Sequence, residues 1–272
     1  MNIQKEINFN EKTGFICDMD GVIYHGNRLL PGVKEFVDWL YQEDKKFLFL
    51  TNSSSKTPRE LQDKLARMGL DVDEKHFYTS ALATAEFIAA QNPGATVYGI
   101  GEPALFNALY EKGLTLNDVN PDYVVIGESP NYNYDSICRA VQLVHKGARL
   151  IGCNTDLTCP TEAGLMPACR ALIAPVEMVT GQSAYFVGKP NPLMMRTGLK
   201  MLGVHSQDAA IIGDRMDTDI VAGIESGLDT LLVLSGVTSR EDLKHYPYQP
   251  RLVLSGVGAI PPAADKPKKV IA

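Results

Sequence analysis

Cysteine and tryptophan are scarce in this chain, whose 272 residues include five cysteines and one tryptophan. The cysteines stand at positions 17, 138, 153, 159 and 169, and no two of them show the C-x-x-C spacing of zinc and redox motifs. Cys153 and Cys159 lie close in the sequence, but no second pair of ligands accompanies them, so we expect no zinc site. An odd set of cysteines without paired spacing is explained most simply by reduced thiols, which predicts a cytoplasmic location.

Long apolar runs and basic blocks are also missing. No apolar run approaches the roughly 20 residues that a transmembrane helix needs, and residues 1–6 lack the apolar core of a signal peptide. We therefore expect no membrane partner. Lysine and arginine total 26 against 32 aspartates and glutamates, and the net charge is −6 at pH 7. Because nucleic acid binding requires clustered positive charge, we expect no nucleic acid polymer as a partner.

What the chain does have is a regular alternation of strand and helix patterns. Strands are expected at 15–17, 47–50, 96–100, 123–127, 149–152, 185–187, 209–212, 230–234 and 252–254. Helices are expected from Pro31 through residue 41, and at 58–68, 103–112, 134–146, 193–202 and 218–226. This alternation predicts an α/β fold, with a parallel sheet covered by helices on both faces. The tail 261–272, which is rich in proline and lysine, is expected to be loose.

Asp18 and Asp20 directly follow the first predicted strand, in the stretch Asp18-Met19-Asp20-Gly21. Side chains two residues apart in a strand point the same way, so the two carboxylates are expected to lie together. Adjacent bare carboxylates repel each other, and a hard cation such as Mg²⁺ removes that cost. The pair is a candidate for a Mg²⁺ site with a nucleophile beside it, although taken alone it also fits an ordinary loop with two aspartates.

Three further polar clusters each follow a predicted strand. They are Thr51-Asn52-Ser53, Gly188-Lys189-Pro190 and the stretch 213–219 from Gly213 to Asp219. Each alone also fits a structural role, namely a capped turn, a solvated lysine and a helix N-terminus rich in acids. In parallel sheets, ligands bind beyond the carboxyl ends of the strands. The position of all four clusters at strand ends therefore predicts one shared site.

These clusters supply the groups that phosphoryl transfer requires. One carboxylate can attack phosphorus, and a second carboxylic acid can protonate the leaving oxygen and then activate water. A hydroxyl and an amide can hold phosphate oxygens, while a lysine and a divalent cation offset the negative charge. Without such cations, a dianionic phosphate could not lie beside several carboxylates.

The four clusters, in this order, resemble the signature loops of the haloacid dehalogenase superfamily of phosphatases, and the resemblance covers nearly the whole chain. The long insertion between the second and third clusters is similar to a type-2 cap. Further motifs are similar to those of the NagD-like subfamily: Asp-Met-Asp-Gly-Val at 18–22, Leu-Thr-Asn-Ser at 50–53, Tyr-Thr-Ser-Ala at 78–81, Asp-Val-Asn-Pro-Asp at 118–122, Val-Gly-Lys-Pro at 187–190 and Leu-Val-Leu-Ser-Gly-Val at 232–237.

The resemblance implies a Rossmann-like, doubly wound parallel sheet as the core, with an inserted α/β cap domain. The core would comprise residues 1–82 and 185–272, and the cap residues 83–184. The implied activity is Mg²⁺-dependent hydrolysis of small phosphorylated metabolites, such as sugar phosphates, nucleoside monophosphates or 4-nitrophenyl phosphate, through an aspartyl-phosphate. The family analogy also suggests a homodimer formed through the cap.

The resemblance also implies a role for each motif residue. Asp18 would be the nucleophile and a metal ligand, and Asp20 the general acid and base, which also gives the metal its backbone carbonyl. Asp214 would complete the metal ligands. The residues expected at the phosphate or substrate are Thr51, Asn52, Ser53, Lys189, Asp217 and Asp219, of which Lys189 neutralises charge and the last two support the metal loop.

The expected substrate-reading segment of the cap runs from Asn154 to Arg170. Relatives tend to carry glycine at the position of Arg170, so this arginine either faces an acidic substrate or pairs on a helix surface with an acid such as Glu177. Two other functions remain open from the sequence. One is phosphotransfer to an acceptor other than water, and the other is a non-catalytic protein that binds or senses phosphometabolites.

Overall fold

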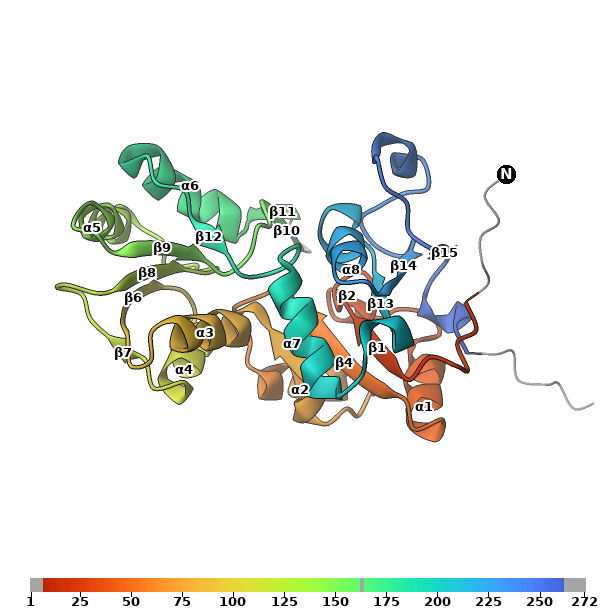
Figure 1. Cartoon of the computed structure of the whole chain (residues 1–272). Helices are drawn as coiled ribbons and strands as arrows, with labels where there is room; N and C mark the ends of the chain where they lie inside the picture. The colour runs from red at the N-terminus through yellow and green to blue at the C-terminus, as the bar shows by residue number, and fades with distance from the viewer. Residues whose placement is uncertain (1–6, 162–163, 262–272) are drawn as a thin grey trace, which may run out of the picture.

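The computed structural model describes residues 7–161 and 164–261, and its main feature is two parallel sheets side by side (Figure 1). The first sheet has the strand order β15-β14-β13-β1-β4-β5, and every neighbouring pair is parallel. Its strands are β1 (Gly14–Cys17), β4 (Lys46–Thr51), β5 (Phe77–Thr79), β13 (Ala209–Gly213), β14 (Asp229–Val233) and β15 (Leu252–Leu254). The predicted parallel sheet is thereby confirmed.

Alternate residues of the central strands pack against helices on opposite faces of this sheet. Phe15, Phe47 and Phe49 share one apolar cluster with α1 and α2, whereas Leu48 and Leu50 share another with α7 and α8. These helices are α1 (Val33–Gln42), α2 (Pro58–Arg67), α7 (Pro192–Leu202) and α8 (Val221–Glu225). Because strands buried on both faces are typical of doubly wound sheets, the predicted fold class is confirmed.

The second sheet has the order β12-β9-β8-β6-β7 and is also parallel. Its strands are β6 (Thr96–Ile100), β7 (Thr115–Leu116), β8 (Tyr123–Ile126), β9 (Arg149–Gly152) and β12 (Tyr185–Phe186). Its helices are α3 (Ser80–Gln91), α4 (Pro103–Glu111), α5 (Tyr134–His145) and α6 (Cys169–Thr180). Two antiparallel hairpins complete the strands: β2 (Tyr24–His25) with β3 (Arg28–Leu29), and β10 (Thr158–Thr161) with β11 (Gly164–Pro167).

The strand before Lys189 pairs with the second sheet, whereas the sequence analysis expected the core to resume at residue 185. Tyr185 and Phe186 pair with Ile151 and Gly152 of β9, so β12 is an edge strand of the second sheet. Lys189 thus enters the site on the segment that returns from the second sheet. Helix α3 is continuous across position 83 and packs on both β5 and α4. We therefore propose a core and a cap domain. The chain passes from the core into the cap through α3, and it returns to the core after Phe186.

The predicted and observed elements differ most where a helix is buried on most sides or interrupted. Helix α3 is rich in buried alanine and has no one-sided apolar stripe, and α6 contains Pro175 in its interior. The sequence pattern predicted neither helix. The helix expected at 218–226 is a π-helical turn over Met216–Ile220 followed by α8. Helix α1 begins after Gly32, whose φ of 79° is left-handed and whose Cα lies against Gly258, rather than at Pro31.

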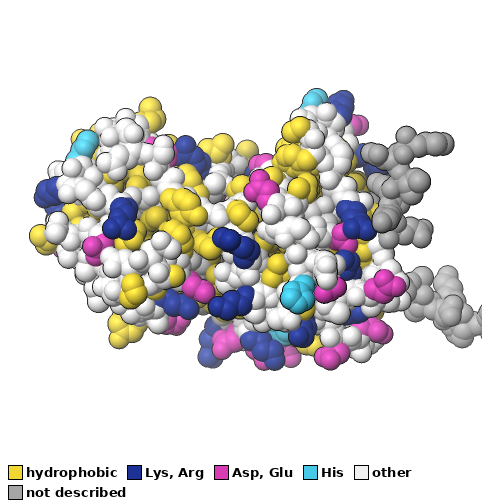
Figure 2. All heavy atoms as spheres, viewed as in Figure 1, with side chains coloured by type: hydrophobic (Ala, Val, Ile, Leu, Met, Phe, Trp, Pro, Cys, Tyr) yellow, Lys and Arg dark blue, Asp and Glu magenta, His cyan; other side chains and the backbone are white. Residues whose placement is uncertain are grey.

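The surface of the protein mixes charged and apolar side chains. On the face shown in Figure 2, basic and acidic side chains are interspersed over the core, and the surface is notched between the two sheets' lobes. Among the described residues, none of the helices is both long and apolar enough to cross a membrane. The tail that the sequence analysis expected to be loose lies outside the described residues beyond Pro261.

Candidate active site

The carboxyl ends of β1, β4 and β13 meet at one edge of the first sheet, because these strands are neighbours in the order β13-β1-β4. Asp18 follows β1, Thr51 ends β4, and Asp214 follows β13. The backbone N–H of Asp18 donates to the carbonyl of Ile212 at 2.8 Å, which extends the ladder into the loop. Parallel pairing therefore brings together residues that are almost 200 positions apart, as the sequence analysis expected for this edge.

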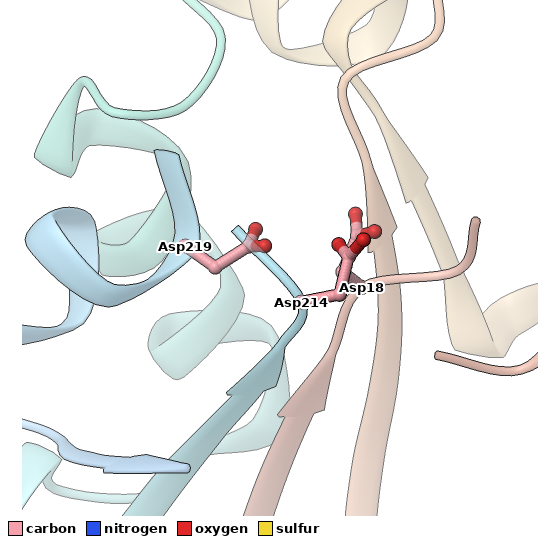
Figure 3. A group of neighbouring side chains, drawn as sticks. All are labelled: Asp18, Asp214 and Asp219. Atoms are coloured by element: carbon pink, nitrogen blue, oxygen red, sulfur yellow. The ribbon is translucent and has the colours of Figure 1, made fainter. Parts of the chain in front are cut away.

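Three carboxylates converge at this edge (Figure 3). Asp18, Asp214 and Asp219 each offer one oxygen, and these oxygens lie within 4.8 Å of one another. Burial raises the pKa of Asp18 well above its usual range, and the neighbouring carboxylates of Asp219 and Asp214 raise it further. Burial, followed by the charge of Asp219, likewise raises the pKa of Asp214. The cluster is costly unless positive charge accompanies it.

Lys189 supplies part of that charge. Its ammonium group is enclosed, with 2% of the side chain exposed, and it donates to Asp219 at 2.8 Å, to the Leu50 carbonyl at 3.3 Å and to Asp18. Burial by itself would lower the pKa of Lys189, but the carboxylates of Asp18 and Asp219 outweigh it and raise that pKa. Lys189 is therefore a permanent cation between the two acids.

The same cluster fits a divalent cation. Asp214 is 1% exposed, and its Oδ2 accepts from the Val237 N–H at 2.7 Å, while its Oδ1 is buried without a hydrogen-bond partner among the described residues. Gly236 lies so close that an added Cβ would fall 1.9 Å from Asp214 Oδ2, so a larger residue here would displace this carboxylate. An enclosed oxygen without a donor, beside two more carboxylates, is the donor set that Mg²⁺ prefers.

Asp20 is exposed and does not belong to this carboxylate cluster. Its Oδ2 accepts a hydrogen bond of 3.1 Å from the hydroxyl of buried Tyr24, and the ammonium of Lys64 lies 3.6 Å from the centre of the Tyr24 ring. Removal of surrounding water raises the pKa of Asp20, and Lys64 and the Tyr24 hydroxyl oppose the rise. Because part of Asp20 stays exposed to solvent, this effect is weaker than in a closed site.

Thr51, Asn52 and Ser53 form the loop beside Lys189. The Thr51 hydroxyl accepts from the Ser53 N–H at 3.1 Å. The Asn52 side chain accepts from the Lys189 N–H at 2.7 Å and donates to the Lys189 carbonyl at 3.0 Å. It also donates to both carboxylate oxygens of Asp156, each at 3.2 Å. The amide of Asn52 is thus engaged with protein groups on every side, and any contact of Asn52 with phosphate stays a prediction.

The two acids of the 213–219 loop lie in different surroundings. Asp219 belongs to the carboxylate cluster, and its Oδ2 also accepts from the Arg215 N–H at 3.1 Å. Asp217 has 52% of its side chain exposed and accepts two hydrogen bonds from the Arg215 guanidinium, at 2.8 and 3.1 Å. The structure therefore brings Asp219 to the site and leaves Asp217 at its rim.

Two residues of the second sheet's lobe reach the site loop in a way that the motifs did not predict. The carboxylate of Glu128 accepts from the N–H of Ser54 at 2.9 Å and from the amide of Asn154 at 2.7 Å. Asn154 also donates to the Asn52 carbonyl at 2.6 Å. Glu128 follows the carboxyl end of β8, so the strand-end rule used for the core would have found it had it been applied to the cap.

Arg170 does not face the carboxylate cluster. It forms an ion pair with Glu177 and lies 5.2 Å from the centre of the Phe186 ring. Glu177 also accepts from the Ala184 N–H at 2.8 Å. The pairing with Glu177, which the sequence analysis kept as the alternative, is the arrangement observed.

Comparisons with known proteins agree with this geometry. The chain matches a model of haloacid dehalogenase-like hydrolases over residues 15–115 and a HAD-hydrolase-like model over residues 186–260. It is 40% identical over 253 residues to dihydroxyacetone phosphatase of Corynebacterium glutamicum, which covers 93% of this chain and 92% of the relative. It is 42% identical over 245 residues to ribonucleotide monophosphatase NagD of Escherichia coli, covering 90% of this chain and 96% of that protein.

Solved structures show the same likeness. The structure of 4-nitrophenylphosphatase from Thermotoga maritima superposes with a TM-score of 0.88 at 33% identity, and the match covers 92% of this chain and 96% of that one. The structure of NagD from E. coli superposes with a TM-score of 0.86 at 41% identity, over 91% of this chain and 97% of that one. The shared fold therefore extends over both sheets.

Proposed function

The chain belongs to the haloacid dehalogenase-like hydrolases, and we propose that it is a Mg²⁺-dependent phosphatase of small phosphorylated metabolites that acts through an aspartyl-phosphate. The observation that supports this most is the convergence of Asp18, Asp214 and Asp219 around the buried ammonium of Lys189. Membership in a hydrolase family, together with phosphatase relatives, decides against the non-catalytic alternative.

In the proposed reaction Asp18 is the nucleophile. A carboxylate oxygen of Asp18 attacks phosphorus, the bond from phosphorus to the leaving oxygen breaks, and Asp20 gives its proton to that oxygen. Water then attacks phosphorus and returns a proton to Asp20, which releases inorganic phosphate and restores the Asp18 carboxylate. The raised pKa of Asp20 favours the protonated form that the first step requires.

The remaining residues are proposed to stabilise the negative charge of the phosphoryl group. Lys189 contacts Asp18 and is placed to neutralise the transferring group, while the Thr51 to Ser53 loop offers hydroxyl groups to phosphate oxygens. Asp18, Asp214 and Asp219, with the Asp20 carbonyl, would hold Mg²⁺. When bound, the ion supplies electrophilic stabilisation of charge on the phosphoryl oxygens.

The proposed substrate class rests on the relatives. They are named as phosphatases of dihydroxyacetone phosphate, of ribonucleotide monophosphates and of 4-nitrophenyl phosphate, which share only a phosphate ester on a small organic group. We extend that class to this chain. We also propose that it acts in the cytoplasm, where the buried thiols of Cys17, Cys153 and Cys169 stay reduced, and that it forms a homodimer through the cap.

The test is phosphate release from 4-nitrophenyl phosphate by the wild type and by Asp18→Asn, with Mg²⁺ and with EDTA. We expect hydrolysis by the wild type that requires Mg²⁺, and a loss of at least ~10³-fold in Asp18→Asn, because an amide is not a nucleophile at this position. Hydrolysis that persists in Asp18→Asn would refute the aspartyl-phosphate route. Faster ester cleavage in the presence of added alcohols, with phosphate transferred to them, would instead favour phosphotransfer.

A further inference from the structure

The cap contacts the loop 51–53 and Lys189 through a short run of residues after β9. Asn154 donates to the Asn52 carbonyl at 2.6 Å, and the Thr155 hydroxyl donates to the Lys189 carbonyl at 3.1 Å. Asp156 accepts from the Asn52 amide through both of its oxygens. Its own N–H donates to Asn154 Oδ1 at 3.0 Å, which fixes the run internally. Three consecutive cap residues thus contact two residues of the core site, Asn52 and Lys189, which lie 137 positions apart in the chain.

Asn52 links this run to the catalytic lysine. Its Oδ1 accepts from the Lys189 N–H, so its NH₂ group must face the Lys189 carbonyl and Asp156. Both N–H bonds of that group are then used, one on Lys189 and one on Asp156. Because three partners fix the amide plane, the backbone of Lys189 is clamped at its N–H and at its carbonyl. The side chain that leaves this clamped residue is the one that contacts Asp18.

Asp156 is a half-buried carboxylate whose surroundings both raise and lower its pKa. Burial raises the pKa of Asp156 to about 6, while Arg215, Lys189 and the hydrogen bond from Asn52 oppose the rise. A buried carboxylate is kept only where donors and cations compensate its desolvation. Here the compensating cations are Arg215 and Lys189, and the hydrogen-bond donor is Asn52, so the carboxylate and the amide hold each other in position.

We propose that Asp156 is a positioning residue for phosphoryl transfer, which acts from the cap by holding Asn52, and through Asn52 the backbone of Lys189. This inference rests on the proposed function of the site. It gives the cap a role in the chemistry common to all substrates, in addition to any contact with the leaving group. A shift of a catalytic group by about 1 Å can lower the rate by about 10²-fold, so such a clamp has a measurable effect.

The experiment compares Asp156→Ala, Asp156→Asn, Asn52→Ala and the double variant with the wild type. The matched control is Asp135→Ala, which removes an exposed cap carboxylate at the start of α5. For each protein, kcat and KM are measured on 4-nitrophenyl phosphate and on glycerol phosphate, and the binding of inorganic phosphate with Mg²⁺ is measured by calorimetry. Melting curves show which variants are folded.

For Asp156→Ala we expect kcat/KM to fall by ~10- to 100-fold, by the same factor on both esters, since the phosphoryl group is common to them. Phosphate binding should weaken in parallel. Asp156→Asn, which keeps the shape and one acceptor, should lose less and serves if Asp156→Ala does not fold. The double variant should be no worse than Asn52→Ala alone, because both substitutions break one chain of contacts.

Several results would overturn the inference. Activity of Asp156→Asn and Asp156→Ala equal to that of the wild type and the Asp135→Ala control would do so. Losses that differ strongly between the two esters would indicate that Asp156 contacts the leaving group instead. If the losses of the two single variants multiply in the double variant, Asp156 does not act through Asn52. A wild type that neither cleaves any ester nor binds phosphate would refute the proposed function itself, and this inference with it.

Discussion

Replacing Asp214 by Asn should make the metal-free protein more stable while abolishing its response to Mg²⁺. In the folded protein, burial and the charge of Asp219 raise the pKa of Asp214 to about 7 from an ordinary value of 3.8. A difference of about 3 pH units between the folded and unfolded pKa corresponds to ~4 kcal/mol of destabilisation once the group is ionised in both states. Asn carries no charge and can still accept from the Val237 N–H.

The sign of the pH dependence follows from the direction of the shift. A raised folded pKa means that the folded state binds more protons than the unfolded state between about pH 4 and pH 7, so wild-type stability falls as pH rises through that window. The advantage of Asp214→Asn should therefore be absent near pH 4 and complete above pH 7. Allowing for desolvation of the new amide, we expect a gain of ~2–4 kcal/mol at pH 8, or a rise in Tm of roughly 5–10 °C.

The assay is thermal unfolding in EDTA and in Mg²⁺ at pH 5 and pH 8. A ligand at 100 times its Kd stabilises the folded state by ~2.7 kcal/mol, so the wild type should gain in Mg²⁺ and the variant should not. Asp38→Asn, which removes an exposed carboxylate from α1, is the control and should behave as the wild type. A variant less stable than the wild type in EDTA at pH 8, or one that keeps the full response to Mg²⁺, would refute the reasoning.

Two other predictions concern charged residues on either side of the site. Lys189→Met leaves Asp18 and Asp219 without their buried cation, so we expect a loss of ~3–5 kcal/mol at pH 8 in EDTA, and no activity. The loss should be smaller at pH 5, because the pKa of Asp18 is raised and a lower pH favours its neutral form; equal loss at both pH values in unfolding curves would contradict this. Arg170→Gly should leave the ranking of phosphate esters by kcat/KM unchanged, since Arg170 pairs with Glu177, and should lower the free energy of unfolding by about 1 kcal/mol or less. A changed ranking would indicate that Arg170 contacts the substrate.

The strand-end motifs predicted most of the site because parallel pairing makes position in the chain a guide to position in space. Asp18, Thr51 and Asp214 each follow a short apolar run, and the strands they follow are neighbours in the sheet. The distinction between Asp217 and Asp219 could not be read in this way. It depends on the π-helical turn over Met216–Ile220, which turns one acid inward and leaves the other with Arg215.

The strand-end rule can place Glu128 at the edge of its own sheet, but it could not predict which residues of the core the cap contacts. Glu128 and Asp156 lie in segments that follow β8 and β9 of one sheet, and they contact a loop of the other sheet, 74 and 104 residues away from their partners. No local pattern encodes how two lobes meet. The sheet to which Tyr185–Phe186 belongs could not be predicted for the same reason, since a two-residue apolar run fits the edge of either sheet and only its pairing with β9 decides.

The balance of charge explains why the site requires both a lysine and a divalent cation. Asp18, Asp214 and Asp219 bring three negative charges within a few ångströms, and Lys189 cancels one of them. A site with two remaining negative charges would repel a phosphate dianion, whereas a divalent cation brings it to neutrality. Asp20 is not counted among these charges, because it can act as an acid only while it is protonated and neutral. Asp20 stands outside the carboxylate cluster, and removal of surrounding water raises its pKa, which favours the protonated acid, while Lys64 and the hydrogen bond from the Tyr24 hydroxyl oppose that rise.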